Sequence, residues 1–213
     1  PGVQWKSIVP PETVPELENL CHRYFGKLVV GYEDEGPEEL EKFDPWQRFY
    51  VDIVMYHVRA RVEAARSGRL RKHVEEGLGV LRLILEGTSG SGKTRANRAV
   101  VGQVRRLWRE YGFSDEEVYR ACALSAPTGT AAFQVRRGAA TAHRTYGVPI
   151  DYCGPPDAAK VKRYQLKLLS SVLHIVDEYS MLGRVFFGKI DYLSQHYFQV
   201  SPEGFGGLAV SMG

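Results

Sequence analysis

The stretch Gly87-Thr-Ser-Gly-Ser-Gly-Lys-Thr94 follows the apolar run Val80-Leu-Arg-Leu-Ile-Leu85 after a single glutamate. Its pattern, G-x-x-x-x-G-K-[ST], is that of a phosphate-binding loop between a strand and a helix. Glycines let the backbone curl so that successive N–H groups point at phosphate oxygens, and the positive end of the next helix faces the same anion. Average residue usage produces such a match by chance in roughly one chain in a hundred of this length. We therefore expect a strand over 80–86, a helix over 95–108 and a bound nucleoside triphosphate between them.

The whole loop is expected to bind the nucleotide, and its last two residues have separate tasks. Lys93 would reach the terminal phosphates as a point charge, while the Thr94 hydroxyl would ligate the magnesium ion that accompanies the nucleotide. The predicted nucleotide-binding residues of the loop are Gly87, Thr88, Ser89, Gly90, Ser91, Gly92, Lys93 and Thr94.

The composition permits several classes of protein. The chain has 213 residues, enough for one domain with an extension, and its 28 basic against 25 acidic residues permit nucleic-acid binding without requiring it. The widely spaced Cys21, Cys122 and Cys153 indicate neither a disulfide framework nor a zinc site and favour a reducing compartment. No run is apolar enough to span a membrane, and no signal pattern opens the chain. We expect the ends at Pro1 and Gly213 to be cuts in a longer chain.

Two regions differ in character. Residues 1–42 carry several prolines and an acidic cluster, which predict a partly ordered extension, and residues 43–213 form one domain. Asp44 followed by proline predicts a helix start, and the helix is expected to run to Arg66. Its expected apolar positions are Phe49, Ile53, Tyr56 and Val62, and its expected stop is Ser67-Gly68.

Two further apolar runs predict strands. They cover Tyr119–Ala126 and Val172–Val176, and helices are expected over 157–170 and 184–196. Strands that alternate with helices imply a parallel sheet covered on both faces. Ligands of such sheets bind at the carboxyl ends of the strands, where this chain has polar, glycine-containing or acidic segments.

An acidic pair, Asp177-Glu178, directly follows the last of these strands. Magnesium needs only one or two protein oxygens, so Asp177 and Thr94 suffice to hold it, and Glu178 is free to act as a general base. Such a pair alone is more often a strand-end cap, but the upstream loop favours the catalytic interpretation. We thus predict Lys93, Asp177 and Glu178 as catalytic residues, and His174 as a hydrogen-bonded core or edge histidine and not a ligand.

Several segments resemble the motifs of one protein family. In order and spacing they are similar to the Q motif, motif Ia, its histidine-containing successor, motif II and the approach to motif III of PIF-type and RecD-like superfamily 1 DNA helicases. The segments are Phe43-Asp-Pro-Trp-Gln47, Ala126-Pro-Thr-Gly-Thr-Ala-Ala132, Ala140-Thr-Ala-His-Arg-Thr-Tyr-Gly147, His174-Ile-Val-Asp-Glu-Tyr-Ser-Met-Leu182 and Phe205-Gly-Gly-Leu-Ala-Val-Ser-Met-Gly213. The resemblance covers residues 43–213 and implies an α/β fold of the P-loop NTPase class, the first RecA-like motor domain, with helices on both faces of a parallel sheet.

The resemblance also implies a function. A protein of this family would couple hydrolysis of ATP, with Mg²⁺, to 5′ to 3′ movement along single-stranded DNA, in DNA repair, recombination or telomere maintenance. It would be intracellular, and nuclear or mitochondrial in a eukaryote. By the same resemblance Gln47 would bind adenine, and its amide can indeed bond both N6 and N7 of that base. From spacing alone, an exposed polar residue in a first helical turn is an equally good interpretation.

The predicted DNA contacts lie in two of these segments. Thr128-Gly-Thr130 stands where a strand meets a helix, so its hydroxyls and the helix N-terminus can bind a phosphate without reading bases, although such a turn is more often a helix cap. The predicted DNA-binding residues are Thr128, Gly129, Thr130, Thr141 and His143, with Arg136, Arg137 and Arg144 as nearby positive charge. A single-strand groove needs that charge, but basic clusters are more often solvated surface.

The chain also departs from the family. The aspartate and glutamine of motif III and the arginines of motifs IV to VI would lie beyond Gly213, on a missing part that includes a second RecA-like domain. Without those arginines, turnover could fall on the order of 10³-fold, so we expect this fragment to bind ATP better than it hydrolyses it. Two alternatives stay open: a P-loop ATPase that does not act on DNA, and a catalytically decayed helicase copy that only binds nucleic acid.

Overall fold

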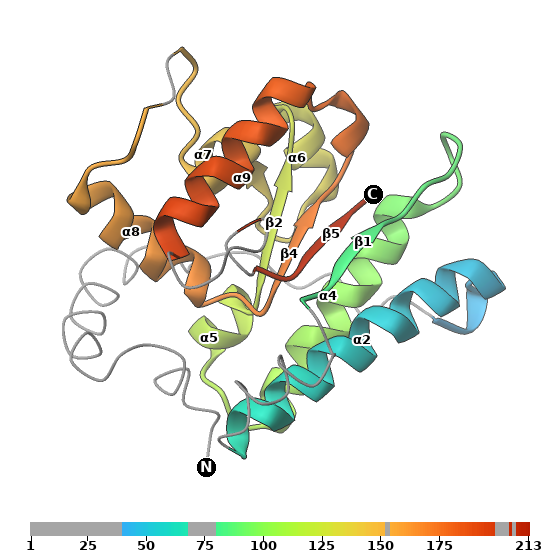
Figure 1. Ribbon diagram of the computed structural model, residues 1–213. Helices are drawn as coiled ribbons and strands as arrows, with labels where there is room; N and C mark the ends of the chain where they lie inside the picture. Colours follow the sequence, from blue (N-terminus) through green and yellow to red (C-terminus); the bar gives the residue numbers. More distant parts are fainter. Residues whose placement is uncertain (1–39, 68–79, 152–153, 199–204, 206–207) are drawn as a thin grey trace.

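The computed structural model describes residues 40–67, 80–151, 154–198, 205 and 208–213. Within them, five parallel strands form one sheet in the order β1-β5-β4-β2-β3 (Figure 1). The strands are β1 (Arg82–Ile84), β2 (Cys122–Ala126), β3 (Ala140–Thr141), β4 (Leu173–Val176) and β5 (Val210–Met212). The α/β class with a parallel sheet is confirmed, whereas the predicted extension over 1–42 lies almost entirely outside the described residues.

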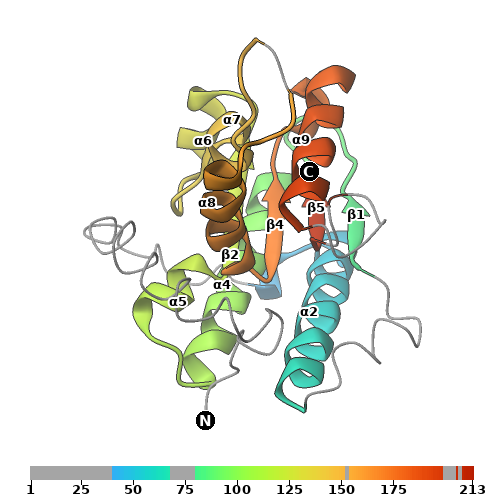
Figure 2. The same cartoon turned by 60° about the vertical axis from the view of Figure 1, so that its left-hand side comes forward.

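Helices pack on both faces of this sheet (Figure 2). They are α2 (Pro45–Arg66), α4 (Lys93–Glu110), α5 (Asp115–Arg120), α6 (Gly129–Val135), α7 (Ala142–Tyr146), α8 (Ala158–Leu169) and α9 (Arg184–Phe198), with 3-10 turns η3 (Leu40–Lys42) and η4 (Tyr179–Met181). Helices α2, α4, α5 and α6 share one buried apolar core, and α7, α8 and α9 share the other. No helix in the described part of the chain is long and apolar enough to span a membrane.

Strand β4 contributes side chains to both cores. Leu173 and Ile175 belong to the core beneath α2 and α4, while Val176 belongs to the core beneath α8 and α9. Successive side chains of a strand point to opposite faces, so a strand buried on both sides is expected to be mostly apolar. All four residues of β4 are buried, as the apolar run predicts.

The edge strand β1 departs from that pattern. Leu81 lies in the core shared by α2 and α4, and Leu83 and Leu85 pack against it. Arg82 and Ile84 point the other way, and Ile84 is 55 % exposed. Among the described residues β1 is therefore less covered than β4, because an edge strand has fewer neighbours to cover it.

Helix α2 begins and ends where the sequence predicts. The Asp44 carboxylate accepts hydrogen bonds from the backbone N–H groups of Trp46 at 2.8 Å and Gln47 at 3.0 Å, which caps the helix. Not all of the expected apolar positions are buried: Phe49 and Tyr56 are 57 % and 62 % exposed, whereas Val62 is buried and Ile53 packs against the core. Two apolar stripes alternate on this helix, and the one that packs on α4 is the stripe of Tyr50, Val51, Val54, Met55, Val58 and Val62.

The second strand starts three residues later than predicted. Tyr119 and Arg120 end helix α5, and β2 begins at Cys122. A capping box starts this helix: Ser114 Oγ accepts from Glu117 N, and Glu117 Oε2 accepts from Ser114 N at 2.9 Å. The apolar character of the run 119–126 concealed this helix end, although the Ser-x-x-Glu pattern before it was visible in the sequence.

His174 is a core residue in β4, as predicted, with no exposed surface. Its predicted hydrogen bond is not formed at full bonding geometry among the described residues, although the Leu168 backbone interacts with the ring. The nearest ring is Tyr146, with centroids 6.0 Å apart. Burial lowers the pKa of His174 to about 4, so the imidazole is neutral at physiological pH.

Candidate active site

The phosphate-binding loop leaves β1 and enters α4, which begins at Lys93, two residues before the predicted start. Gly90 and Gly92 have φ of 81° and 82°, a backbone region that side-chain-bearing residues rarely adopt. A Cβ on Gly92 would also collide with the Gln47 amide nitrogen. The backbone conformation therefore favours glycine at position 92, and any larger residue would also displace the Gln47 side chain.

Lys93 curls back along its own loop. Its ammonium Nζ donates to the carbonyl oxygen of Gly87 at 2.8 Å and of Thr88 at 3.3 Å. The charge thus lies within the curve of the loop, where phosphate oxygens are bound in loops of this pattern. When a nucleotide binds, its phosphate oxygens would replace these two carbonyls as the acceptors of the Lys93 ammonium.

Thr94 and Asp177 meet at the carboxyl end of β4, as predicted. Thr94 Oγ1 donates to Asp177 Oδ2 at 2.8 Å, and Asp177 is only 2 % exposed. A hydroxyl beside a carboxylate is the hard-oxygen donor set that Mg²⁺ prefers, so these residues fit the ion. Elsewhere in the described part of the chain, no three His, Cys, Asp or Glu side chains come together as a metal-binding group. Magnesium here would complete its shell with water and phosphate oxygens.

Glu178 is turned out of the sheet by its own backbone. It has φ 55° and ψ 37°, in the left-handed region, and its side chain is exposed. The end of β5 holds this turn, because Gly213 N donates to Val176 O at 3.0 Å and Tyr179 N donates to Gly213 O at 3.2 Å. Asp177 therefore points into the molecule and Glu178 toward solvent, the separation that a metal ligand and a general base need.

Gln47 lies against the phosphate-binding loop, although it is distant in sequence. Its Nε2 donates to the Ser91 carbonyl at 2.9 Å, and its Oε1 accepts from Asp44 N at 3.3 Å. Both ends of the amide are thus engaged by the protein. Binding adenine would require these bonds to exchange. Beside it, the Arg95 guanidinium stacks on the Phe43 ring at 4.7 Å.

The threonines predicted to contact DNA cap short helices. Thr128 Oγ1 accepts from Ala131 N at 3.1 Å at the start of α6, and Thr141 Oγ1 accepts from Arg144 N at 3.3 Å at the start of α7. A hydroxyl that accepts one bond still has a proton to donate, so capping does not exclude a phosphate contact. Gly129 and Thr130 are exposed in the first turn of α6.

The positive charge near these caps is smaller than predicted. Arg136 and Arg144 are exposed, but Arg137 is only 7 % exposed and its carbonyl accepts from Arg105 Nη2 at 3.1 Å. Arg137 is therefore not available to a DNA strand, because it is turned inward against α4.

His143 lies 4.3 Å from the Phe186 ring, between centroids, and its Nδ1 lies 3.0 Å from the Val148 carbonyl. A carbonyl only accepts, so that contact makes Nδ1 the protonated nitrogen.

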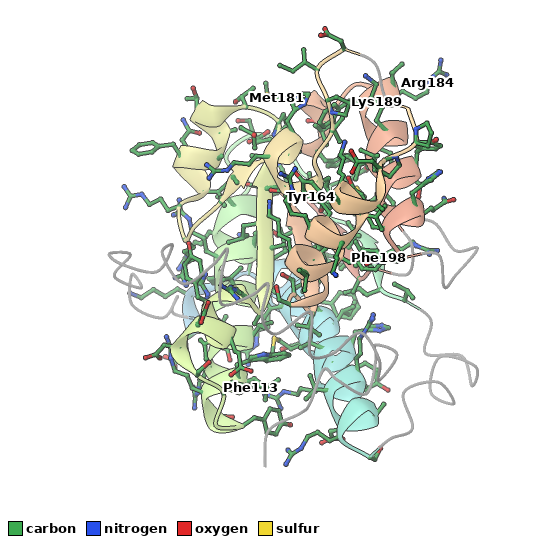
Figure 3. The ribbon with its side chains drawn as sticks, turned by 90° about the vertical axis from the view of Figure 1, so that its left-hand side faces the viewer. Phe113, Tyr164, Met181, Arg184, Lys189 and Phe198 are labelled. Carbon is green, nitrogen blue, oxygen red and sulfur yellow. The ribbon has the colours of Figure 1, made fainter. Side chains whose placement is uncertain are left out.

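Both sets of residues lie at the same end of the sheet, toward opposite edges (Figure 1). In Figure 3, Met181 and Arg184 mark this end, and Phe113 marks the opposite end. The phosphate-binding loop follows β1, whereas Thr128 follows β2 and Thr141 ends β3. Since neighbouring strands are about 4.8 Å apart, the strands that carry the two sets are separated by roughly 14 to 19 Å.

The sequence model of the AAA domain family matches residues 71–195, which is more than half of the chain. The chain belongs to the AAA domain family. No curated protein matches its sequence significantly.

Solved structures resemble this AAA domain too. Pif1 helicase from Candida albicans matches with a TM-score of 0.56 and 16 % identity, over 80 % of this chain and 32 % of that one. A structure of two coordinating Pif1 helicases, solved for DNA unwinding at forked dsDNA, matches with a TM-score of 0.49 and 23 % identity. The match covers 80 % of this chain and 32 % of that one. Bacteroides Pif1 bound to ssDNA matches with a TM-score of 0.43 and 28 % identity, over 67 % of this chain and 30 % of that one. The Candida albicans match shows a shared fold, and the chain spans about a third of the length of these proteins.

Three residues of the AAA domain's site were not predicted. Asn97 Nδ2 donates to Asp177 Oδ1 at 2.9 Å, and Tyr50 donates its hydroxyl to Asn97 Oδ1 at 2.6 Å. The Tyr50 hydroxyl oxygen also lies 2.9 Å from Ser211 Oγ. The only sequence signal is a polar side chain at a core position, such as Asn97 within the apolar stripe of α4. That signal marks a buried hydrogen bond without indicating its partner.

Proposed function

We propose that this AAA domain is the N-terminal motor domain of a PIF-type superfamily 1 DNA helicase, which couples ATP hydrolysis to movement along single-stranded DNA. The contact between Thr94 Oγ1 and Asp177 Oδ2 at 2.8 Å, next to a complete phosphate-binding loop, carries the proposal. A hydroxyl and a carboxylate side by side next to such a loop are the donors that a nucleotide-bound metal would need, which supports the proposal. The fold shared with Candida albicans Pif1 and the resemblance of five sequence segments to helicase motifs support it.

In this proposal each site residue has one task. Backbone N–H groups of the loop and the Lys93 ammonium bind the phosphates, and Thr94 with Asp177 would hold Mg²⁺. Bound magnesium would neutralise negative charge on the phosphate oxygens. A Glu178 carboxylate oxygen orients the attacking water and accepts its proton. The exposed position of Glu178 leaves room for that water.

The DNA strand is proposed to run over the starts of α6 and α7. Thr130 and the backbone of Gly129 would bind a phosphate at the N-terminus of α6, and Thr128 and Thr141 would donate their remaining hydroxyl protons. With Nδ1 donating to the Val148 carbonyl, Nε2 of His143 would accept a hydrogen bond from a donor group of the strand. Backbone contacts of this kind do not depend on base sequence, as a translocating motor requires.

Further parts of the proposal rest on the sequence resemblance alone. They are the selection of ATP by Gln47, the 5′ to 3′ direction, a role in DNA repair, recombination or telomere maintenance, and a nuclear or mitochondrial location in a eukaryotic cell. Gln47 already lies 2.9 Å from the Ser91 carbonyl, so an adenine base bound beside the loop would be within reach of its amide.

Substitution of Lys93 tests the nucleotide site. In the intact protein, Lys93→Ala is expected to lower ATP turnover by a factor on the order of 10² to 10³, because one charge that stabilises the transferring phosphate is lost. Phosphate release at saturating single-stranded oligonucleotide measures it.

Lys189→Ala is the matched control. Lys189 Nζ also donates to a carbonyl, that of Asp151 at 2.9 Å, but lies on α9. Turnover close to wild type in the control and strongly lowered in Lys93→Ala supports the assignment. Unchanged turnover in Lys93→Ala would overturn it.

A further inference from the structure

Four polar side chains from four elements form one continuous hydrogen-bonded chain behind the nucleotide site. Tyr50 of α2 donates its hydroxyl to Asn97 Oδ1 at 2.6 Å, and the same hydroxyl oxygen lies 2.9 Å from Ser211 Oγ of β5. Asn97 of α4 donates from Nδ2 to Asp177 Oδ1 at 2.9 Å. This series of hydrogen bonds therefore ends on the Asp177 carboxylate, which is proposed to hold magnesium.

These side chains are buried almost completely. Tyr50 is 4 % exposed, Asn97 and Ser211 are fully buried, and Asp177 is 2 % exposed. Around them the core consists of residues such as Val54 and Val100. Apolar side chains of similar size would fill this space without the desolvation penalty of polar groups. The fold alone therefore does not require a polar cluster here.

The chemistry of the four groups fixes the direction of every bond. A carboxylate only accepts, so the Asn97 amide must turn its NH₂ group toward Asp177 and its oxygen toward Tyr50. Tyr50 must then donate to that oxygen, which leaves its own oxygen to accept from Ser211. Burial raises the pKa of Tyr50, which keeps its hydroxyl protonated as this direction requires.

Both oxygens of Asp177 are consequently held by one helix. Thr94 donates to Oδ2 and Asn97, one turn later on α4, donates to Oδ1. The end of β5 closes the space around this pair, since a Cβ on Gly213 would lie 2.8 Å from Asn97 Nδ2. Asp177 thus has little freedom to rotate. Tyr50 in turn keeps the Asn97 amide in the orientation that donates.

We propose that Tyr50 and Asn97 are positioning residues that orient the Asp177 carboxylate for the metal and connect it to helix α2. This inference rests on the proposed function, because it concerns the same site. Tyr50 lies one turn after Gln47, which bonds the phosphate-binding loop through Ser91. Helix α2 therefore contacts both the loop and, through Asn97, the metal carboxylate.

The test measures how much Mg²⁺ strengthens nucleotide binding. A non-hydrolysable ATP analogue is titrated into the intact protein, once with Mg²⁺ and once with a chelator. The dissociation constant in chelator divided by that in Mg²⁺, the magnesium ratio, is compared among variants. In Tyr50→Phe this ratio is expected to fall about tenfold, the effect typical for loss of a group that orients a metal ligand. Binding in chelator is expected to stay close to wild type.

Tyr197→Phe is the matched control for a lost buried hydroxyl. Tyr197 is fully buried in the core beneath α8 and α9, and its hydroxyl donates to the Tyr146 carbonyl at 3.1 Å. Its removal is expected to lower the thermal unfolding midpoint while leaving the magnesium ratio at the wild-type value. A purely structural role for Tyr50 predicts that both variants behave alike, and that result would overturn the inference.

A second variant tests the order of the hydrogen bonds from Tyr50 through Asn97 to Asp177. It also tests the inference if Tyr50→Phe does not fold. Asn97→Ala is expected to lower the magnesium ratio at least as much as Tyr50→Phe, because it removes the donor itself. The double variant is expected to match Asn97→Ala alone, since Tyr50 acts through Asn97. Additive losses would contradict that order.

Two failures can be told apart in the same titrations. If the wild-type protein binds no nucleotide under either condition, the proposed function fails. If it binds nucleotide and Lys93→Ala weakens that binding, but Tyr50→Phe and Asn97→Ala leave the magnesium ratio unchanged, only the positioning role fails.

Discussion

Asp177 and Glu178 are adjacent in the sequence and differ in almost every physical respect. Asp177 is buried, and both its oxygens accept hydrogen bonds, from Thr94 and Asn97. Glu178 is exposed on a left-handed backbone with φ 55°, a conformation that is unfavourable for a residue with a side chain. Strain at such a position is often found at functional sites, where it aims one particular side chain. Here it separates the proposed metal ligand from the proposed base.

The exposed carboxylate leads to a prediction at this scale. Glu178→Gln is expected to leave the affinity for ATP close to wild type and to lower hydrolysis by roughly 10² to 10⁴, because the amide cannot accept the proton of the attacking water. Binding of a non-hydrolysable analogue and single-turnover phosphate release measure the two effects separately. Glu110→Gln, exposed at the end of α4, is the control and should be without effect. Loss of affinity without loss of the chemical step would argue against a base at this position.

Residues of the site differ in how far the sequence reveals them. Lys93 and Thr94 belong to a contiguous pattern, and Asp177 directly follows an apolar strand, so local spacing was enough to predict their positions. Asn97 and Tyr50 have no such pattern, and Tyr50 and Ser211 are 161 positions apart in the chain. Their contacts exist only because α2, α4 and β5 pack together. Sequence spacing alone therefore could not have identified them.

Helix α5 shows the same limit at the scale of an element. The run 119–126 is mostly apolar, and its first residues were predicted to start a strand. Local hydrogen bonds decided otherwise, because the Ser114 and Glu117 capping box starts a helix that continues through Arg120. For the two-residue strand β3 no sequence signal was sufficient. The longer elements α2, α4, α8, α9 and β4 were predicted nearly to their ends, because their periodicity or caps extend over several residues.

The capping box can be tested by its effect on stability. Ser114→Ala removes the acceptor for Glu117 N and is expected to lower the free energy of unfolding by about 1 kcal/mol. Ser180→Ala, exposed in η4, is expected to change it by less than about 0.5 kcal/mol. Urea denaturation of the intact protein compares the two variants with wild type. Equal values for both would show that the cap does not stabilise α5.

At the scale of the whole molecule, the sheet order arranges the two proposed functions. Strands β5 and β4 lie between β1, which leads into the phosphate-binding loop, and β2 with β3, which lead to the proposed DNA contacts. The sequence predicted that these segments share one end of a parallel sheet, because carboxyl ends of parallel strands always do. It did not predict the order of the strands, which depends on long-range pairing. Asp177, at the end of β4, stands between the two sets of residues and is one strand away from β2.

This arrangement predicts that DNA binding changes the rate of ATP hydrolysis, even though the proposed DNA contacts and the proposed nucleotide contacts do not share residues. The change would pass through β4 and β2, whose ends carry Asp177 and Thr128. A P-loop ATPase unrelated to DNA would hydrolyse ATP at a rate indifferent to DNA. A decayed helicase copy would bind DNA and release no phosphate.

The most direct test is the rate of phosphate release from ATP by the intact protein, measured with and without a single-stranded oligonucleotide and repeated at increasing salt. We predict that the oligonucleotide raises the rate, that the oligonucleotide concentration needed rises with salt because phosphate contacts weaken, and that Lys93→Ala abolishes the stimulated rate. A rate that is the same with and without DNA, or no phosphate release at all, would contradict the account.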